Sequence, residues 1–407
     1  MLASFDLNSF IRRCVTKREL SLLTDDLVMH NAELRECIDD ASVLVIGGAG
    51  EIGSSYIKAL LSFNAAKLVV VDINENGLTE LTRDLRSAGK YRMPKDFITY
   101  SVSFADNVFR KLFKAHGPFD IVANFAAHKH VRSEKDVFSI EVMIENNVLQ
   151  AKRLLDLLCE TPPRHFFCVS TDKAVNSVNI MGASKKLMEE LIMAYASRLP
   201  VSTARFANVA FSNGSLPFGF LQRISKRQPL ACPLGVRRFF VSPGESGELC
   251  LLASVIGKSG DIVFPKLDTT RDMISFEQIA VDLLREFGME VDHCTTEYEA
   301  REKMKSRAVG VTNKWPVYFF ESDTSGEKAF EEFYAPGETL DFGTFANLGV
   351  IKNAIRRSIT EIDTIYKELR QLFASSETSK EKIVVALENY LPDFSHIEKG
   401  RNLDSKM

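Results

Sequence analysis

The stretch VLVIGGAGEIG, residues 43–53, decides the fold of this chain. Its apolar start predicts a buried strand, and the apolar periodicity of residues 54–63 predicts a helix directly afterwards. Glycines between such elements let the chain turn tightly, let backbone amides approach a diphosphate, and let helix and strand pack closely. We therefore interpret the stretch as a dinucleotide-binding turn rather than an ordinary glycine-rich loop. The predicted contacts are Gly47, Gly50, Glu51, Ile52 and Gly53.

Apolar runs and helical patterns alternate beyond this turn. The patterns predict strands at residues 68–71, 121–124 and 166–169, and helices at 78–87, 108–114, 147–158 and 185–197. The strands are apolar throughout, which is typical of strands covered on both faces. This alternation predicts an α/β protein with a Rossmann-like doubly wound parallel sheet in a cofactor-binding domain over residues 41–205.

Three further segments flank the predicted domain. Residues 1–40 carry helical patterns and predict an N-terminal helical extension. Residues 206–345 alternate irregularly and contain loops rich in Pro and Gly, so we expect mainly a smaller substrate-binding lobe, some segments of which could return to the sheet. Residues 346–407 are expected to be accessory C-terminal helices, with one long amphipathic helix at 350–373 and another at 379–391.

The composition argues against several classes of protein. The 407 residues carry a formal charge of -3, which is not the electrostatic signature of a nucleic-acid-binding protein. The 7 cysteines are scattered without a C-x-x-C pair, which argues for a reducing compartment and against a structural zinc site. No apolar run reaches the roughly 18–20 residues that a membrane span needs. We expect a cytoplasmic protein with no metal site.

The end of the second predicted strand indicates which dinucleotide binds. Asp72 lies where a carboxylate accepts hydrogen bonds from the adenosine ribose and repels a 2′-phosphate. This favours NAD over NADP; the alternative is an aspartate in an ordinary turn. Ile73 and Asn74 follow in the same turn and are predicted to contact the cofactor. The small residues Ala126 and Ala127, after the third predicted strand, would let the backbone run against it.

The stretch STDKAVNSVNIMGASK carries the reactive groups. Thr171, Asp172 and Lys173 directly follow a predicted strand, which places an acid and a base together at one edge of the sheet. Lys185 lies four residues after Met181, so the two side chains share one face of the predicted helix. Many nicotinamide enzymes have Tyr at that first position, whereas a thioether cannot transfer a proton. The stretch therefore predicts a redox site in which one group is exchanged.

The motifs together resemble those of one enzyme family. Residues 42–335 are similar to the nucleotide-sugar 4,6-dehydratases of the bacterial polysaccharide-biosynthesis type, in the extended short-chain dehydrogenase/reductase superfamily. The greatest similarity is to UDP-N-acetylglucosamine 4,6-dehydratases, some of which have Met at the position of Met181. Besides the glycine turn, the resemblance rests on AAHKHV (126–131), STDKAVN (170–176), MGASK (181–185), RFANV (205–209), RRFF (237–240) and SGEKAFEEF (325–333).

The resemblance implies an internal redox elimination on UDP-N-acetylglucosamine. A hydride leaves C4 of the sugar for NAD, water is lost across C5 and C6, and the hydride returns to C6. We predict that Lys173 is the base at C5 and that Asp172 is the acid at O6. Asp172 could also accept the proton of the C4 hydroxyl first, while Thr171 hydrogen-bonds that hydroxyl. Lys185 is predicted to hold the nicotinamide ribose.

Four residues are candidates for binding the nucleotide sugar. Arg238 offers a bidentate fork for the diphosphate, with Arg237 as the alternative. Asn208 is predicted to contact the substrate, and Glu327 to reach the nucleoside ribose. His130 could contact the sugar or serve only as a structural histidine. The resemblance and the amphipathic terminal helices also suggest a homo-oligomer.

Three other functions remain open from the sequence. The first is the same reaction with inversion at C5, or on another nucleotide sugar. The second is a nucleotide-sugar 4-epimerase or reductase, although neither needs the elimination pair of Asp172 and Lys173. The third is a non-catalytic NAD-binding scaffold, which Met181 supports.

Overall fold

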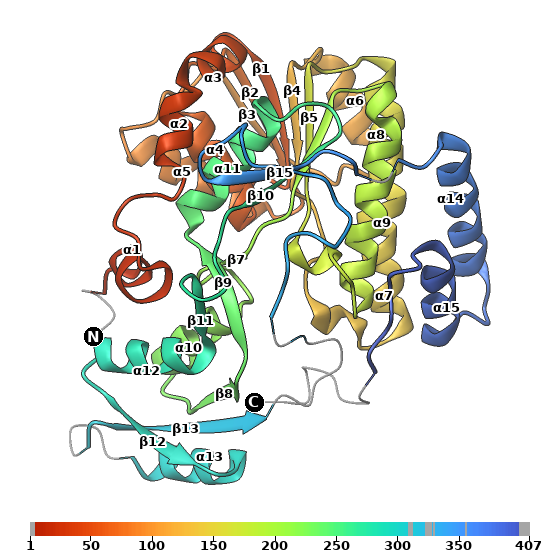
Figure 1. Ribbon diagram of the computed structural model, residues 1–407. Coiled ribbons are helices and arrows are strands. Elements are labelled where there is room, and N and C mark those ends of the chain that lie inside the picture. The colour runs from red at the N-terminus through yellow and green to blue at the C-terminus, as the bar shows by residue number, and fades with distance from the viewer. Residues whose placement is uncertain (1–4, 308–311, 322–327, 329, 355, 399–407) are drawn as a thin grey trace.

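The computed structural model describes residues 5–307, 312–321, 328, 330–354 and 356–398. Over these residues, nine strands form one sheet in the order β14-β15-β10-β6-β5-β4-β1-β2-β3 (Figure 1). The strands from β3 to β10 pair in parallel, and their order is that of a Rossmann-like doubly wound sheet. The predicted fold class is therefore confirmed. The parallel strands are β1 (Ser42–Ile46), β2 (Lys67–Asp72), β3 (Asp96–Ser101), β4 (Ile121–Asn124), β5 (His165–Val169), β6 (Val201–Ala204) and β10 (Asp261–Pro265).

Helices cover both faces of this sheet. One side carries α4 (Glu51–Leu60), α5 (Glu75–Ser87) and α11 (Pro243–Val255), and the other carries α6 (Asn107–His116), α8 (Ala151–Glu160) and α9 (Ile180–Ala194) (Figure 1). α7 (Val137–Ile144) and a π-helical turn (Glu145–Gln150) lead into α8. None of the described helices is long and apolar enough to cross a membrane.

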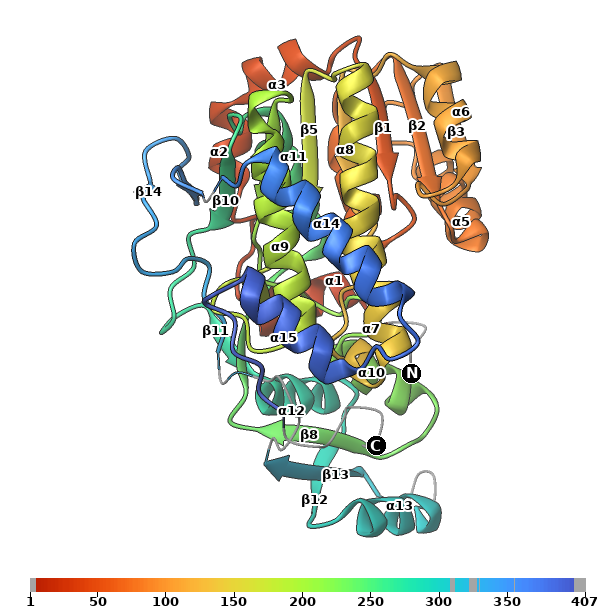
Figure 2. The ribbon, with the colours of Figure 1, turned by 90° about the vertical axis from the view of Figure 1, so that its right-hand side faces the viewer.

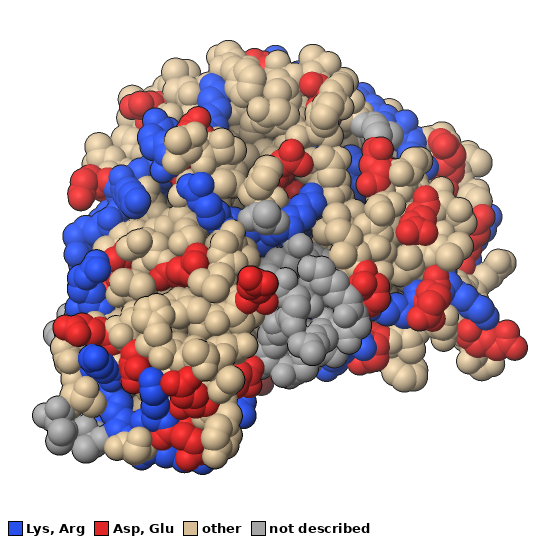
Figure 3. Space-filling view, turned by 60° about the horizontal axis from the view of Figure 1, so that its bottom comes forward, with Lys and Arg blue, Asp and Glu red and all other residues tan. Residues whose placement is uncertain are grey.

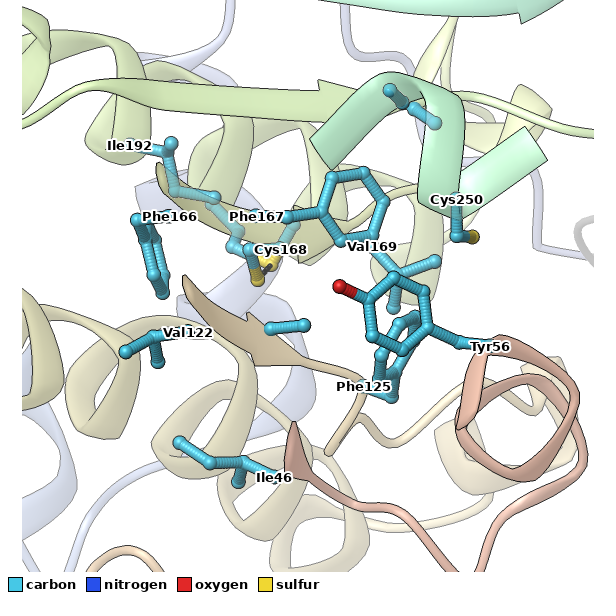
Figure 4. Close-up of a cluster of buried hydrophobic side chains, with 14 of the residues drawn as sticks. Ile46, Tyr56, Val122, Phe125, Phe166, Phe167, Cys168, Val169, Ile192 and Cys250 are labelled. Atoms are coloured by element: carbon cyan, nitrogen blue, oxygen red, sulfur yellow. Dashed lines mark hydrogen bonds between the residues drawn. The ribbon is translucent and has the colours of Figure 1, made fainter. Parts of the chain in front are cut away.

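The central strand β5 lies between two apolar layers (Figure 4). On one side the ring of Phe125 lies 5.8 Å from that of Phe167 and 5.0 Å from that of Tyr56, measured between centroids. On the other side Phe166 faces Ile192 of α9 in the same apolar core. Burying a side chain of this size contributes about 1.5–3 kcal/mol. The polar residues that follow β5 are therefore attached to one of the most tightly packed parts of the sheet.

A smaller lobe lies beyond the carboxyl ends of the parallel strands (Figure 1). It has its own apolar core, built around residues such as Phe220, Leu283 and Trp315. Its helices are α10 (Leu216–Ser225), α12 (Phe276–Glu286) and α13 (Glu297–Ser306). Its strands are β7 (Asn208–Val209), β8 (Leu230–Leu234), β9 (Arg237–Val241), β11 (Met273–Ser275), β12 (Glu290–Cys294) and β13 (Lys314–Glu321).

The N-terminal segment is shared between the two cores. Its helices are α1 (Leu7–Phe10), a π-helical turn (Ile11–Thr16), α2 (Thr24–Met29) and α3 (Asn31–Ile38). Phe10 is buried in the core of the lobe, whereas Leu34 is buried in the core of the sheet domain. Between them, Arg18 donates two hydrogen bonds of 2.9 Å to the carboxylate of Glu245 on α11. The segment thus joins the lobe to the sheet domain.

The prediction of one long helix over residues 350–373 is wrong at its start. Residues 348–351 form β15 (Leu348–Ile351), which pairs antiparallel with β10 and with β14 (Leu340–Asp341). The helix α14 (Ile359–Ala374) begins only after Ser358, whose side chain forms a capping box with Glu361. The run Leu348-Gly349-Val350-Ile351 is completely buried, so its apolar pattern reflects a covered strand. Together with α15 (Lys380–Tyr390), α14 lies outside α8 and α9 (Figure 2).

Candidate active site

The glycine turn joins β1 to α4 at the carboxyl edge of the sheet. Gly47 has a φ of +76°, and a Cβ added there would lie 2.6 Å from the backbone nitrogen of Ala126. A Cβ added at Gly53 would lie 2.3 Å from the carbonyl oxygen of Gly47. No side chain caps the start of α4, so Glu51 and Ile52 present first-turn amides that are free to bind an anion. We call residues 47–53 the cofactor cradle.

The carboxylate of Asp72 lies beside the cofactor cradle. One of its oxygens accepts a hydrogen bond of 2.9 Å from the amide of Ala49, and the other accepts one of 2.9 Å from the amide of Asn74. Asn74 in turn caps α5, and Ile73 between them is exposed. The structure thus brings together the cofactor-binding residues that the sequence predicts after β1 and at the end of β2. Ala126 and Ala127 follow β4 and are half-buried beside the same turn.

The reactive residues after β5 form one hydrogen-bonded cluster. Thr171 donates from its hydroxyl to Asp172 Oδ1 over 2.8 Å, and Lys173 Nζ donates to the same oxygen over 3.1 Å. Lys173 Nζ also donates to Asn208 Oδ1 over 3.3 Å. The Asp172 side chain is 3% exposed and that of Lys173 is 19% exposed. We call Thr171, Asp172, Lys173 and Asn208 the catalytic cluster, after the role that the sequence analysis predicts for the first three of them.

The helix α9 carries the other two predicted residues. Asn179 caps its first turn by accepting a hydrogen bond of 2.7 Å from Gly182. Met181 is buried, and its amide donates to Glu134 Oε1 over 3.0 Å. Lys185 is also buried, which lowers the pKa of its ammonium, and its Nζ donates to the carbonyl of Val169 at the end of β5 over 2.7 Å. Lys185 is therefore held against the strand that leads to the catalytic cluster.

The predicted substrate-binding residues are spread over several elements. Burial lowers the pKa of His130, whose ring is so close to Gly214 that an added Cβ there would lie 2.7 Å from Cε1. Arg238 on β9 is buried, and Nη1 donates to the carbonyl of Arg237 over 2.9 Å. Asn208 belongs to the catalytic cluster. Glu327 lies outside the described residues.

One acidic residue near the catalytic cluster escaped the sequence analysis. Glu331 is 5% exposed, and its Oε2 has no hydrogen-bond partner. Burial raises the pKa of this carboxyl; the charges of Lys173, Arg238 and Lys328 act against that rise, and the charge of Asp172 adds to it. The sequence motifs point instead to Glu327 in the same stretch. The signal available for Glu331 is a pair of acidic residues between two phenylalanines, Phe330-Glu331-Glu332-Phe333.

The segment that carries Glu331 is tied to the loop of the catalytic cluster. Lys328 Nζ donates to the carbonyl of Val175 over 2.8 Å, and Asn176 Nδ2 donates to Glu332 Oε2 over 3.2 Å. Further along, Arg205 at the end of β6 donates to the carbonyl of Phe333 over 3.1 Å. These contacts fasten the segment that carries Glu331 to the residues that directly follow Lys173 of the catalytic cluster and to the end of β6.

Two other features bear on possible ligands. Among the described residues, no three His, Cys, Asp or Glu side chains gather closely enough to hold a metal ion. All 7 cysteines are free thiols. On the face drawn in Figure 3, basic and acidic side chains are interspersed over the lobe.

The sheet order, the cofactor cradle and the acidic end of β2 define a Rossmann-like protein of the dinucleotide-binding type. Within that class, the sequence profile of a family described as "Polysaccharide biosynthesis protein" matches residues 43–339. The chain belongs to this family.

Curated relatives in several organisms share part of the chain. An uncharacterized membrane protein, MJ1061 of Methanocaldococcus jannaschii, is 33% identical over 258 residues, which cover 61% of this chain and 73% of that protein. The capsular polysaccharide biosynthesis protein CapD of Staphylococcus aureus is 25% identical over 368 residues, 88% of this chain and 55% of CapD. The UDP-glucose 4-epimerase of Rickettsia typhi is 30% identical over 234 residues, 56% of this chain and 66% of the epimerase. The chain thus spans little more than half the length of CapD.

Solved structures share the fold. Pen from Bacillus thuringiensis superposes with a TM-score of 0.64 at 20% identity, covering 79% of this chain and 90% of Pen. The dTDP-glucose 4,6-dehydratase DesIV from Streptomyces venezuelae, solved with NAD and TYD bound, has a TM-score of 0.55 at 18% identity and covers 72% of this chain and 88% of DesIV. At these identities the similarity establishes the fold alone.

Proposed function

We propose that this protein is an NAD-dependent nucleotide-sugar 4,6-dehydratase that acts on UDP-N-acetylglucosamine. The observation that carries the proposal is the pair formed by Asp172 and Lys173, which are 3.1 Å apart and largely buried. They follow β5 at the same edge of the sheet as the cofactor cradle, which follows β1, and β4 lies between these two strands. Elimination of water needs an acid and a base on neighbouring atoms of the sugar. Epimerases and reductases move a hydride without an elimination, so the pair favours a dehydratase over the epimerase named among the relatives.

The cofactor cradle fits NAD. The first-turn amides of α4 would hold the diphosphate, because a Cβ at Gly47 or Gly53 would fill the turn and no side chain competes for those amides. Asp72 would accept hydrogen bonds from the adenosine ribose, and Lys185 would hold the nicotinamide ribose. When bound, NAD accepts the hydride of C4 and returns it to C6.

The catalytic cluster would then move the protons. Asp172 takes the proton of the C4 hydroxyl as the hydride leaves, and later gives a proton to O6 so that water departs. Lys173 takes the proton of C5, which the new ketone has made acidic, and returns it to C5 at the end. Thr171 would hydrogen-bond the C4 hydroxyl. This division of roles accounts for Met181, because Asp172 supplies the proton acceptor that a tyrosine would provide.

The proposal is tested by incubating the protein with UDP-N-acetylglucosamine in deuterated water. We expect a 4-keto-6-deoxy product by NMR, with no net formation of NADH and with deuterium incorporated at C5. The configuration at C5 in the same spectrum distinguishes retention from inversion. An epimer that keeps its C6 hydroxyl would show a 4-epimerase instead, and bound NAD without turnover of any nucleotide sugar would show a non-catalytic scaffold.

Gly47→Ala is expected to weaken NAD binding at least tenfold. The added Cβ would meet the backbone of Ala126 at 2.6 Å in a conformation with φ of +76°, so the turn must move away from the diphosphate. Gly89→Ala is the matched control, because Gly89 has a φ of +65° and nothing within 4 Å of an added Cβ. The affinity of each purified variant is measured by calorimetric titration with NAD. Equal affinities of the two variants would contradict the assignment of the cradle.

A further inference from the structure

The pair of Asp172 and Lys173 raises a problem of proton supply for the proposed reaction, on which this inference rests. At 3.1 Å from the Asp172 carboxylate, Lys173 is bound as an ammonium ion, and an ammonium ion cannot accept the proton of C5. When Asp172 accepts the proton of the C4 hydroxyl, the ammonium loses its anionic partner. Lys173 can act as a base only if another group then takes its proton.

Glu331 is placed to be that group. It lies on a segment whose Lys328 and Glu332 are hydrogen-bonded to Val175 and Asn176, two and three residues past Lys173 on the loop of the catalytic cluster. Its carboxyl is near enough to feel the charge of Lys173, although these two side chains, both among the described residues, form no ion pair. The carboxyl is 5% exposed and its Oε2 has no hydrogen bond, so it has an open acceptor. Buried ionised groups are costly, and proton transfer from Lys173 would convert an ammonium and a carboxylate into two neutral groups.

The other charged groups around Glu331 are consistent with this assignment. The charges of Arg238 on β9 and of Lys328 on the same segment both act on its carboxyl, and the Nζ of Lys328 lies 4.0 Å from Oε2. These two cations stabilise the carboxylate form, while burial favours the acid form and raises the pKa of the carboxyl above its usual range. A group under such opposed influences can take up and release a proton within one catalytic cycle.

We propose that Glu331 is the proton carrier of Lys173: after Asp172 has been neutralised, the Lys173 side chain swings to the Glu331 carboxylate, which takes its ammonium proton, and Glu331 returns that proton when the turnover ends. In the first transfer an N–H bond breaks and an O–H bond forms, and no electrons are exchanged. Lys173, now a neutral amine, removes the proton of C5 and later gives it back. Glu331 acts through Lys173 and needs no contact with the sugar.

The test is Glu331→Gln, which keeps the shape of the side chain but cannot carry a proton. We expect kcat to fall about 10- to 100-fold at neutral pH with KM little changed. The loss should shrink as the pH rises, because solvent hydroxide can then remove the ammonium proton in place of Glu331. Glu332→Gln is the matched control: Glu332 is exposed, and an amide can keep the hydrogen bond to Asn176, so its activity should equal that of the wild type.

Stability separates proton transfer from a structural role. A buried carboxyl with a raised pKa stabilises the fold only while it keeps its proton, and this contribution is lost as the pH rises through the pKa of the folded state. The melting temperature of Glu331→Gln should therefore equal or exceed that of the wild type. The difference in melting temperature should grow as the pH becomes more alkaline. A lower melting temperature with the same loss of kcat at every pH would show a structural residue and overturn the proposal, as would unchanged activity.

A further measurement does not depend on turnover. The infrared carbonyl band of Glu331, identified by subtracting the spectrum of Glu331→Gln, reports its protonation as the pH is varied. Removing the charge of Lys173 with Lys173→Met should shift this titration to higher pH, because that charge opposes protonation of Glu331. An unshifted titration would contradict the proposal. If the wild type made no 4-keto product and the shift were still observed, the proposed function would fail while the coupling of Glu331 to Lys173 would stand.

Discussion

Lys173→Met is expected to reduce formation of the 4-keto-6-deoxy product at least 1,000-fold, near the upper end of the effect of a general base. The substitution removes the amine that takes the C5 proton, and it leaves Asp172 with the hydrogen bond from Thr171. Because the Lys173 side chain is 19% exposed and lies in a short 3-10 turn (Asp172–Ala174) after β5, whose packing depends on other residues, the variant should fold. Oxidation at C4 does not need the amine, so the variant should stop with reduced NAD and a 4-keto sugar that still carries its C6 hydroxyl.

Asp172→Asn should stop the reaction at an earlier step than Lys173→Met does. If Asp172 accepts the first proton, this variant should fail before oxidation and show no NADH absorbance on mixing with UDP-N-acetylglucosamine. Stopped-flow absorbance distinguishes the two variants, and NMR in deuterated water shows whether C5 exchanges. Near-normal formation of the 4-keto intermediate by Asp172→Asn would exclude Asp172 as the first acceptor. Continued elimination by Lys173→Met would exclude Lys173 as the base.

Local sequence signals predicted the sheet domain well. A strand covered on both faces must be apolar throughout, so β1, β2, β4 and β5 stand out as continuous runs. The glycine turn and the polar residues after β5 are equally local, because a parallel sheet brings the carboxyl ends of its strands to one edge. Asp172 and Lys173 could therefore be paired from sequence alone.

What could not be predicted depends on contacts between distant segments. β15 was included in a helix because a short buried run has no periodicity that separates a strand from a helix, and its partner β10 lies far away in the sequence. Glu331 is more than 150 residues from Lys173, and no motif links them. Its burial follows from the contacts that Lys328 and residues 330–338 make with the loop of the catalytic cluster and with Arg205, which only the folded chain reveals.

The anchor of that path is Arg205, and Arg205→Met is expected to lower the free energy of unfolding by about 3–5 kcal/mol. The Arg205 side chain is 1% exposed and forms an ion pair of 2.9 Å with Glu189, which is equally buried, and another of 3.0 Å with Glu338. Burial alone would raise the pKa of Glu189, but Arg205 holds it below its ordinary range. Without Arg205, Glu189 becomes a buried charge that keeps only the hydroxyl of Ser170 and the ammonium of Lys186, which is 4.0 Å away. A loss of this size is large because the whole free energy of unfolding of a typical protein is only about 5–15 kcal/mol.

Urea denaturation of the variant across a range of pH checks both the size and the cause of this loss. The stabilising contribution of a carboxylate with a lowered pKa is present above the pKa of the unfolded chain and is lost as the pH falls through the folded pKa. The difference between wild type and Arg205→Met should therefore narrow as the medium becomes acidic. Arg370→Met is the exposed control. It removes an ion pair of 3.4 Å between Glu145 and Arg370, whose side chain is 50% exposed. The free energy of unfolding should fall by only about 0–1 kcal/mol at any pH.

Adding Glu189→Gln to Arg205→Met separates the buried charge from the lost contacts. The double variant no longer buries an uncompensated carboxylate, so it should regain most of the stability. It still lacks the hydrogen bond to Phe333 and the ion pair to Glu338, which hold the segment of Glu331 in place. Its kcat should therefore remain low even though its fold is restored. Full recovery of both stability and kcat would show that the anchor has no part in catalysis, whereas recovery of stability alone would connect the buried arginine to the position of Glu331.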